Sequence, residues 1–442
     1  MTYEEALAYW FRHVNYELRP PEAADLKLDR MRALLACLGN PHQRLRILHI
    51  AGSKGKGSTS ALLAAILQRA GYRTGLFTSP HLSRLEERFQ INGQLIEPNE
   101  VAELLSVIRI SVEQSLAFED RPPTFFELTT ALGLLHFLKH RCEAVVLEVG
   151  LGGRLDSTNV CQPVVAVITS ISYDHTRILG DRLEQIAWEK AGIIKPGRPV
   201  VSGVTAEEAR AVIEQVSEQR QAPLRQLGRD FTYRYEHGRV RSDHVQAPRV
   251  SVQTSSRAWP ALSLNLLGEH QAANAALAVV CVEVLREQGW RITDQAVAAG
   301  LAEVVWPARL EVIRRQPLVV VDCAHNVASA EALLHALEQS FAPRQRLLLF
   351  ASSSDKDVAG MFRVLGPHFA QAVLTRYTNN PRAMPPEQLG QLWKDHSPAP
   401  ALVVPNPAEA LQQALTLTGA DDLLCIAGSV FLAGELRPLL LP

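Results

Sequence analysis

Residues 47–60 read Ile-Leu-His-Ile-Ala-Gly-Ser-Lys-Gly-Lys-Gly-Ser-Thr-Ser, and this stretch decides the fold. An apolar run that favours a β-strand breaks into three glycines, and a helix-like run follows at residues 61–67. Strand, glycine loop and helix in this order form a phosphate cradle. Glycines let backbone N–H groups turn toward an anion, and the helix N-terminus adds the positive end of its dipole. Lys56 can reach terminal phosphates, and a hydroxyl of the next turn can ligate Mg²⁺. The stretch therefore predicts a nucleotide site formed by Gly52, Gly55, Lys56, Gly57, Ser58 and Thr59.

The composition is that of an ordinary globular protein. Hydrophobic residues make up 47% and charged residues 21% of the 442 residues, and a chain of this length is too long for a single core. The net charge of −1 gives no reason to expect a general affinity for nucleic acid or for an anionic membrane. Six scattered cysteines argue against a disulfide framework and structural zinc. The N-terminus is acidic and no apolar run has transmembrane length, so we expect a cytoplasmic protein, and a monomer.

Short β-rich runs alternate with helical patterns through most of the chain, which predicts βαβ units and an α/β fold with largely parallel sheets. The buried strands expected in the first part are residues 47–51, 144–149, 164–171 and 199–204. The segment 231–267 is polar, alternating and rich in turn residues. It predicts a small antiparallel lobe with a hairpin turn at residues 236–239.

A domain boundary is expected near residue 306, which divides the chain into domains 1–305 and 306–442. The second domain shows a new series of strands that alternate with helical stretches, as in a Rossmann-like domain. It lacks Gly-x-Gly-x-x-Gly, so it is not expected to bind a dinucleotide. Its expected strands are residues 318–321, 347–350, 372–374, 401–404 and 423–427.

A motif that carries chemistry follows the strand at residues 144–149, where open α/β sheets gather their ligands. Glu148 is a carboxylate inside an apolar strand, which is costly unless the group is paired or binds a cation. It is therefore a candidate Mg²⁺ ligand, and a buried pair with an arginine is the alternative. The glycines after it allow close backbone approach, and Arg154 and Asp156 offer polar contacts.

Two further motifs follow strong β-forming runs. Residues 169–176 read Thr-Ser-Ile-Ser-Tyr-Asp-His-Thr and precede residues 189–197, the end of a helix capped by glycine and stopped by proline. A lone histidine is usually structural, but His175 follows an aspartate at the end of a strand. Residues 319–326 read Val-Val-Val-Asp-Cys-Ala-His-Asn and open the second domain, and their Cys323 is expected to be inert.

The pattern Gly-x-x-Gly-Lys-Gly-Ser at residues 52–58 resembles the loop of the Mur ligase superfamily. Residues 49–52 resemble its folate branch, the folylpolyglutamate and dihydrofolate synthases. The resemblance implies a P-loop-containing Mur-ligase-like central domain with a small antiparallel lobe, followed by a Rossmann-like C-terminal domain. The family usually has Thr-Asn where this chain has Ser53-Lys54, and Lys54 is either a further phosphate contact or a solvated side chain. Further motifs resemble the family in the same order at residues 78–82, 87–93, 123–127, 268–275, 306–311, 355–357 and 428–432.

The resemblance also implies roles for individual residues at matching positions. Mg²⁺ would be held by Ser58, Glu148, His175 and Lys190, with Lys190 carbamylated; the residues alone leave open an ammonium at Lys190 that pairs with Glu189 or a phosphate. ATP contacts are implied for Gln271, Asn274, Arg309 and Asp322. The implied catalytic residues are Lys56, His175, Lys190, Asp322 and His325. Substrate contacts are implied for Ser79, Pro80, His81, Phe125, Arg154, Asp156, His325 and Ser429.

The implied reaction is ATP-dependent ligation of L-glutamate to a folate. ATP phosphorylates a carboxylate of the pteroyl substrate, and the amino group of L-glutamate attacks the acyl phosphate. Such chemistry needs a glycine cradle, a lysine and Mg²⁺ more than a nucleophile. Residues 152–156 resemble the version found in bacterial bifunctional members. This favours a bifunctional enzyme that accepts both dihydropteroate and reduced folyl polyglutamates.

Two other functions predict different sequences. A ligase that acts on a cell-wall UDP-sugar peptide carries a UDP-binding domain before the P-loop, and only 51 residues precede Gly52 here. A non-catalytic nucleotide-binding module would be expected to lose the metal ligands or the pair Asp322 and His325. All of these residues are present.

Overall fold

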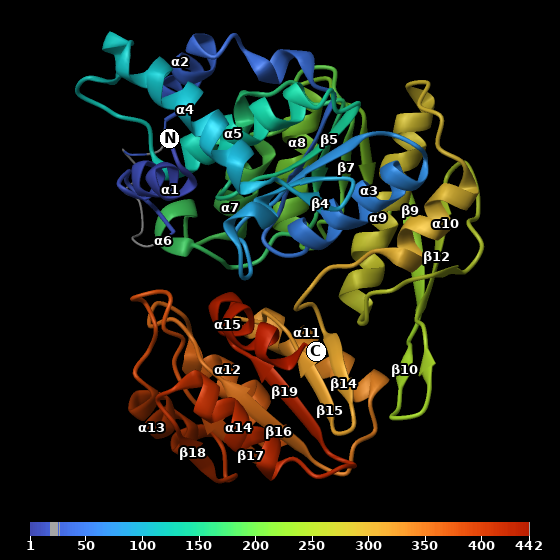
Figure 1. The fold of residues 1–442 in the computed structure, drawn as a ribbon. Helices are drawn as coiled ribbons and strands as arrows, with labels where there is room; N and C mark the ends of the chain where they lie inside the picture. Colours follow the sequence, from blue (N-terminus) through green and yellow to red (C-terminus); the bar gives the residue numbers. More distant parts are fainter. Residues whose placement is uncertain (18–24, 26, 442) are drawn as a thin grey trace. The chain divides into compact units, whose positions relative to one another are not determined.

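The computed structural model describes residues 1–17, 25 and 27–441. The chain divides into two compact units (Figure 1). Unit 1 comprises Met1–Tyr233, Ser251–Leu262 and Ala273–Val304, and unit 2 comprises Arg234–Val250, Ser263–Ala272 and Val305–Pro442. Within the described residues, no helix is both long enough and apolar enough to cross a membrane.

Unit 1 is built on an eight-stranded sheet in the order β4-β3-β2-β5-β1-β6-β7-β8. The strands from β2 to β8 in this order run parallel, whereas β3 and β4 add an antiparallel edge. Because β1 lies between β5 and β6, the loops after these three strands meet at one edge, which we call the carboxyl edge. The strands are β1 (Ile47–Ala51), β2 (Thr74–Phe77), β3 (Phe89–Ile91), β4 (Gln94–Leu95), β5 (Ala144–Glu148), β6 (Val165–Ile168), β7 (Val200–Ser202) and β8 (Leu224–Gln226).

The strands predicted for this part of the chain are present, but those expected at residues 144–149, 164–171 and 199–204 end one to three residues earlier than predicted. The strand expected at residues 164–171 stops at Ile168. The reason is that the side chains of Thr169 and Ser170 turn to the backbone of Lys54, and this contact takes the place of a longer strand ladder.

Helices lie on both sides of this sheet, and in Figure 1 α5 (cyan) and α3 (blue) flank the strands. Val145 and Leu147 of β5 share a buried core with Phe137 of α5. Side chains alternate along a strand, so Glu148 points to the face opposite Leu147. The helices are α1 (Tyr3–Phe11), α2 (Asp29–Cys37), α3 (Lys56–Arg69), α4 (Pro98–Glu113), α5 (Phe125–Lys139), α6 (Thr176–Leu179), α7 (Leu183–Ala191), α8 (Glu207–Gln219), α9 (Glu269–Glu287) and α10 (Asp294–Glu303).

The segment predicted as a small antiparallel lobe forms two short sheets. One is three-stranded, in the order β13 (Leu262–Ser263), β12 (Arg249–Thr254) and β9 (Phe231–Glu236); the other is the antiparallel pair β10 (Arg239–Val240) and β11 (Val245–Gln246). The hairpin turn predicted at residues 236–239 is wrong, because the turn lies at residues 241–244. Gly238 serves a close approach instead, since a Cβ there would press on the carbonyl oxygen of Gln246.

Unit 2 contains a six-stranded sheet in the order β14-β15-β19-β16-β17-β18. Only β14 runs antiparallel to its neighbour, and the rest of the sheet is parallel. The predicted Rossmann-like arrangement is confirmed, and β14 is a strand that the sequence did not predict. The strands are β14 (Glu311–Arg315), β15 (Leu318–Val321), β16 (Arg346–Phe350), β17 (Gln371–Leu374), β18 (Ala401–Val403) and β19 (Leu423–Ala427). The helices are α11 (Val327–Ser340), α12 (Val358–Leu365), α13 (Pro386–His396), α14 (Pro407–Leu417) and α15 (Val430–Leu440).

Candidate active site

The glycine loop between β1 and α3 has the backbone of a phosphate cradle. Gly52 and Gly55 have φ values of 153° and 83°, a region that disfavours other residues. A Cβ on Gly52 would collide with the hydroxyl of Thr169, and one on Gly55 would collide with the side-chain oxygen of Asn274. The structure thus brings the predicted ATP contact Asn274 against the predicted loop. Gly55 also forms the N-cap of α3, so the helix dipole points into the loop.

The side chains of the loop fit an anion and a cation. Lys56 Nζ folds back and donates to the carbonyl oxygen of Gly52 at 3.1 Å, so its charge lies over the loop. Ser58 and Thr59 are buried in the first turn of α3. Thr59 Oγ1 has no hydrogen-bond partner among the residues that the structure describes. Thr59 is fully buried, so its hydroxyl faces the protein interior, and Ser58 is the hydroxyl of this turn that keeps some exposure.

The loop is fastened to the segment that follows β6. Ser53 Oγ donates to the carbonyl oxygen of Ser172 at 2.9 Å, and the backbone N–H of Lys54 donates to Ser170 Oγ at 3.0 Å. Lys54 Nζ forms an ion pair with Asp174 Oδ2 at 2.7 Å. The sequence left Lys54 as a phosphate contact or a solvated side chain, and the structure shows a third arrangement, a brace between two loops of the carboxyl edge.

Glu148 and Lys190 are ionisable side chains that lie buried at this edge. Glu148 at the end of β5 is 4% exposed and accepts a hydrogen bond from the backbone N–H of Ser79 at 3.1 Å. Lys190 on α7 is also 4% exposed. Burial, with the nearby ammonium of Lys56 as the next cause, lowers the pKa of Lys190 to about 7. At neutral pH a large fraction of this amine is therefore uncharged.

His175 stands at the start of α6 with a left-handed backbone, and its side chain is half exposed. Its Nε2 lies 3.8 Å from Oδ1 of Asp174, the residue that also holds Lys54. Asp174 therefore links the predicted metal ligand His175 to the cradle. Arg154 is held at the same edge by a two-point ion pair with Glu189, the residue before Lys190.

Asp156 lies inside the loop rather than on its surface. Its carboxylate accepts hydrogen bonds from Leu151 N at 2.8 Å, Thr158 N at 3.0 Å and Thr158 Oγ1. Burial raises its pKa. Thr158 Oγ1 also lies 2.9 Å from Nε2 of His49 on β1. In the structure Asp156 therefore shapes the glycine-rich turn and ties it to the strand that leads into the cradle.

The loop after β2 contains the predicted substrate residues Ser79, Pro80 and His81, with a cis peptide bond before Pro80. His81 Nδ1 accepts a hydrogen bond from Nε of Arg88 at 2.9 Å. Burial, followed by the charge of Arg88, lowers the pKa of His81 to about 4, so its ring is neutral. Phe125 is 1% exposed, stacks on Trp10 and Phe11, and has the guanidinium of Arg88 over its ring.

Arg88 is a residue whose role the sequence did not reveal. It is fully buried, donates two hydrogen bonds of 2.7 Å to the carboxylate of Glu17, and lies over the ring of Phe125. It therefore fixes the loop of His81 from behind. The segment 87–93 carries the family resemblance, but the partner Glu17 lies 71 residues away in sequence, so the motif gave no sign of the pair.

The carboxyl edge of the sheet in unit 2 gathers the predicted residues of the second domain. Asp322 follows β15 and accepts hydrogen bonds from Leu310 N at 2.8 Å and Ala324 N at 2.7 Å. The charge of Asp322 also acts on His270, whose pKa is lowered mainly by burial. His325 lies just after it, with Nδ1 at 2.8 Å from the carbonyl oxygen of Cys323.

Two more predicted residues lie on the same sheet. Arg309, two residues before β14, donates from Nη1 to the carbonyl oxygen of Ala308 at 3.0 Å. Ser429 follows β19, the strand next to β15, and its Oγ caps α15 by accepting from Phe431 N. The predicted residues of unit 2 thus follow or adjoin neighbouring strands, as a binding edge requires.

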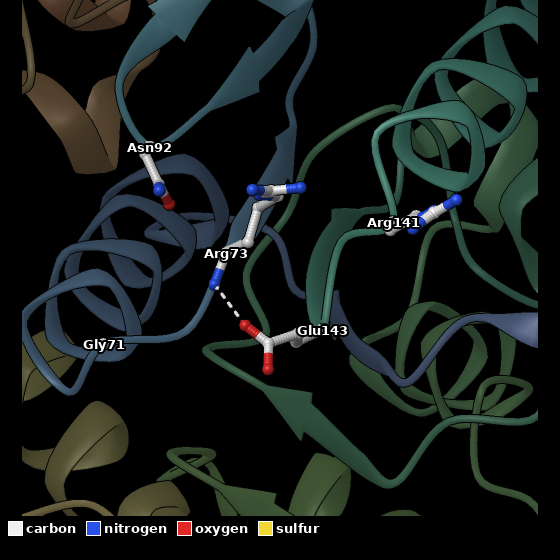
Figure 2. Close-up of a pocket in the computed structure, with 5 residues that line it drawn as sticks. All are labelled: Gly71, Arg73, Asn92, Arg141 and Glu143. Carbon is white, nitrogen blue, oxygen red and sulfur yellow. Dashed lines mark hydrogen bonds between the residues drawn. The ribbon is translucent and has the colours of Figure 1, made fainter.

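A pocket of about 400 Å³ lies elsewhere, as Figure 2 shows. Arg73 and Glu143 immediately precede β2 and β5, so the pocket is at the amino edge of the sheet, opposite the cradle. The backbone N–H of Arg73 donates to the Glu143 carboxylate at 2.9 Å. None of the predicted site residues lines it. The lining residues are Gly71, Arg73, Asn92, Arg141 and Glu143.

Comparisons with known proteins extend over the whole chain. Residues 50–282 match the Mur ligase middle domain, and residues 308–430 match the Mur ligase glutamate ligase domain. The chain is 33% identical over 445 residues to the dihydrofolate synthase/folylpolyglutamate synthase of Bacillus subtilis, covering 99% of this chain and 98% of that protein.

Solved structures agree with this similarity. The E. coli FolC structure in complex with DHPP and ADP is 28% identical, with a TM-score of 0.85, and the match covers 99% of this chain and 97% of that chain. Mycobacterium tuberculosis folylpolyglutamate synthase, complexed with ADP and AMPPCP, is 33% identical with a TM-score of 0.85, covering 94% of this chain and 95% of that one.

Proposed function

Because the chain belongs to the folylpolyglutamate and dihydrofolate synthase family of Mur ligases, we propose that it uses ATP to join L-glutamate to a folate. The observation that carries the proposal is the carboxyl edge of unit 1. There a glycine cradle with the Lys56 charge over it adjoins a buried glutamate and a buried lysine. The relatives that are named for this activity match nearly the full length of the chain.

The cradle is the proposed site of the ATP phosphates. Backbone N–H groups of the loop and Lys56 Nζ would bind them, and Asn274, packed against Gly55, would contact the nucleotide. In unit 2, Asp322 and Arg309 are assigned to ATP as well. Phosphoryl transfer depends on positioning and on charge neutralisation, and these residues supply both.

The donor set at this edge fits Mg²⁺. The hydroxyl of Ser58, the carboxylate of Glu148 and the imidazole of His175 are the proposed ligands, together with a modified Lys190. Oxygen donors predominate in this set, as Mg²⁺ prefers. Bound Mg²⁺ would neutralise phosphate charge. The buried carboxylate of Glu148 at the end of β5 is the feature of the structure that supports a cation here.

We further propose that Lys190 is carbamylated. Its uncharged Nζ adds to the carbon of CO₂, a C–N bond forms, one C=O electron pair moves onto oxygen, and Nζ loses a proton to solvent. The product is an anion with two hard oxygen donors. The ammonium would repel a cation, whereas a pKa of about 7 makes the reactive amine available at neutral pH.

The folate and the glutamate are assigned to separate groups of residues. Ser79, Pro80 and His81 would contact the folate, with Arg88 and Phe125 holding their loop from behind, and Arg154 would meet a carboxylate of the substrate. Asp156 would affect substrate binding indirectly, because it holds the shape of the turn after β5. His325 and Ser429 in unit 2 are assigned to L-glutamate.

The proposed reaction has two steps. A carboxylate oxygen of the folate takes the γ-phosphoryl group of ATP, which gives an acyl phosphate and ADP. The amine of L-glutamate then attacks the acyl carbon, an amide bond forms, phosphate leaves, and the nitrogen loses a proton. We propose that dihydropteroate and reduced folyl polyglutamates are both accepted, and that the enzyme acts as a cytoplasmic monomer.

Glutamate-dependent ADP release tests the function. We expect turnover with dihydropteroate and with tetrahydrofolate, and none with a UDP-sugar peptide as the acceptor. Reactions without L-glutamate, and reactions with the Lys56→Ala variant, measure the background of ADP released by contaminating ATPases. Turnover with the UDP-sugar peptide alone would refute the folate assignment, and turnover with only one folate would refute the dual specificity.

A further inference from the structure

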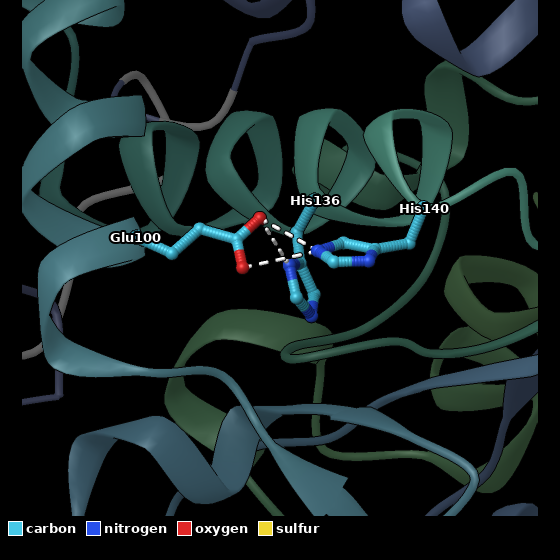
Figure 3. Close-up of side chains that lie close together, drawn as sticks. All are labelled: Glu100, His136 and His140. Carbon is cyan, nitrogen blue, oxygen red and sulfur yellow. Dashed lines mark hydrogen bonds and ion pairs between the residues drawn. The ribbon is translucent and has the colours of Figure 1, made fainter.

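Three side chains on two helices of unit 1 form a cluster that the proposed reaction does not use. Glu100 lies on α4, and His136 and His140 lie one turn apart at the end of α5 (Figure 3). α5 leads into the start of β5, whereas Glu148 ends that strand. The cluster therefore belongs to the amino edge of the sheet, away from the cradle. Residues at i and i+4 share one face of a helix, which is how two histidines can hold one ion.

The distances within the cluster match those between ligands of one metal ion. Glu100 Oε1 lies 3.1 Å from His136 Nδ1 and 2.9 Å from His140 Nε2. One ligand atom from each residue can be chosen so that all lie within 4.8 Å of one another. With zinc bonds of about 2.1 Å, a tetrahedral site separates its ligand atoms by roughly 3.4 Å. Small rotations of the side chains would therefore admit an ion.

His136 is the buried member of the cluster, whereas Glu100 and His140 are partly exposed. His136 is 3% exposed, and its Nε2 has no partner among the described residues. Nδ1 of His136 faces Glu100 and is the ring atom that would bind an ion, whereas Nε2 lies on the far side of the ring.

The surrounding charges leave room for a positive ion. Lys139 Nζ lies 3.5 Å from Glu100 Oε1, but its shorter ion pair, at 2.7 Å, is with Glu103. The ammonium of Lys139 is thus shared between two carboxylates, and Glu100 is the more distant of the two. Arg73 turns its guanidinium to the carbonyl oxygen of His140 and thereby fixes the end of α5. The side chain of His140 is 43% exposed, which leaves a path for the ion and for a water as the fourth ligand.

We propose that Glu100, His136 and His140 form a binding site for a borderline divalent transition metal such as Zn²⁺, which links α4 to α5. Two imidazoles and one carboxylate suit zinc, whereas Mg²⁺ prefers a set made of oxygens. At the carboxyl edge oxygen donors predominate, so that site should prefer Mg²⁺ to Zn²⁺. The two ions would thus be sorted by the chemistry of their ligands.

Titration with Co²⁺ tests the site, because tetrahedral Co²⁺ absorbs visible light. The full-length protein is first stripped with a chelator and then kept in millimolar Mg²⁺ to occupy the oxygen-rich site. We expect one Co²⁺ per chain, displaced by one Zn²⁺, and at least tenfold weaker binding in His140→Ala and Glu100→Gln. His335→Ala is the matched control, because His335 lies 3.6 Å from Glu269 in an exposed pair that is not part of a three-ligand cluster among the described residues.

Thermal unfolding separates a metal site from a simple hydrogen-bonded brace. Zn²⁺ should raise the unfolding temperature of the wild type and of His335→Ala but not that of His140→Ala. His140→Cys replaces one zinc ligand with another and should restore the response. Co²⁺ spectra that the cluster variants leave unchanged, or no response to Zn²⁺ at 100-fold excess over protein, would overturn the proposal.

Discussion

The carboxyl edges of the two parallel sheets are built from the same strand–loop–helix units but present different chemistry. In unit 1 the edge combines positive-φ glycines with Lys56 and with two buried ionisable side chains, Glu148 and Lys190. In unit 2 the acidic residue Asp322 is bound by two backbone N–H groups, and Ser429 caps a helix. Lys56 of the first edge thus donates within its own loop, whereas the polar groups of the second edge hold the backbone in a fixed geometry.

This difference predicts how each edge responds to substitution. Lys56 donates to a carbonyl oxygen of its own loop and should contribute little to folding, so its removal should affect activity and leave stability nearly unchanged. A group that accepts backbone hydrogen bonds contributes to both. The predictions below test this contrast, beginning with the residue expected to matter most.

Lys56→Ala should give the largest loss of activity, on the order of a hundredfold or more in kcat, because it removes the charge over the proposed phosphate site. Lys56 Nζ donates to the carbonyl oxygen of Gly52 in its own loop, so the urea midpoint of unfolding should stay unchanged. Steady-state kinetics and urea denaturation measure the two effects. A destabilised variant would show that Lys56 belongs to the fold rather than to the site.

Lys190→Ala should be nearly as severe, with a loss of about a hundredfold. A short carboxylic acid added to the buffer should restore part of the activity, since it can supply the missing oxygen donors. For the wild type, activity should fall as the pH drops through about 7, because the amine then gains a proton and cannot add CO₂. Mass spectrometry under non-denaturing conditions should detect the added CO₂. Full activity in buffer freed of CO₂ would contradict the carbamate.

Asp322→Asn tests the edge of unit 2. An amide can accept only one of the two backbone hydrogen bonds and would turn its NH₂ group toward the other donor, a loss of about 1–3 kcal/mol. Activity should fall roughly tenfold or more, and, unlike Lys56→Ala, the variant should unfold at lower urea. Equal stability of the two variants would remove the distinction between the edges.

Arg88→Met should affect the folate more than ATP. It leaves the Glu17 carboxylate without its buried partner and removes the donor to His81, so the KM for the folate should rise about tenfold. Removal of this cation also raises the pKa of His81, so folate binding should weaken as the pH falls. Arg84→Ala is the control, because its side chain is 59% exposed. A matching rise in the KM for ATP would argue for general damage to unit 1.

The sequence predicted the parts of the site in which chemistry and chain order coincide. The glycine loop directly follows β1 and directly precedes α3, so residues 47–60 contained the whole unit. The same is true of Asp322 and His325 after β15. In each case the motif and the strand that positions it are adjacent in the sequence.

Contacts between distant segments could not be predicted in this way. The bonds from Ser53 and Lys54 to residues 170–174 span more than 100 positions, and the cluster of Glu100 with two histidines depends on how α4 packs on α5. Gly238 was read as a turn residue because a glycine between alternating runs favours a hairpin. Its place is set by the close approach of Gln246, which only the fold reveals.

Lys54→Asn should have the smallest effect, within about threefold in kcat, because a partly exposed ion pair contributes little. The backbone of residue 54 would still bond to Thr169 and Ser170, so the loop should keep its shape. The charge of Lys54 lowers the pKa of Lys190, and its partner Asp174 acts in the opposite direction. In Lys54→Asn the lowering effect of the Lys54 charge is lost, and the Asp174 carboxylate no longer has its ion-pair partner. Both changes raise the pKa of Lys190, so the pH at which activity is half maximal should move upward. A severe loss in Lys54→Asn beside a mild one in Lys56→Ala would show that Lys54 is the phosphate lysine. The carboxyl edge of unit 1 would then be organised around the brace rather than the cradle.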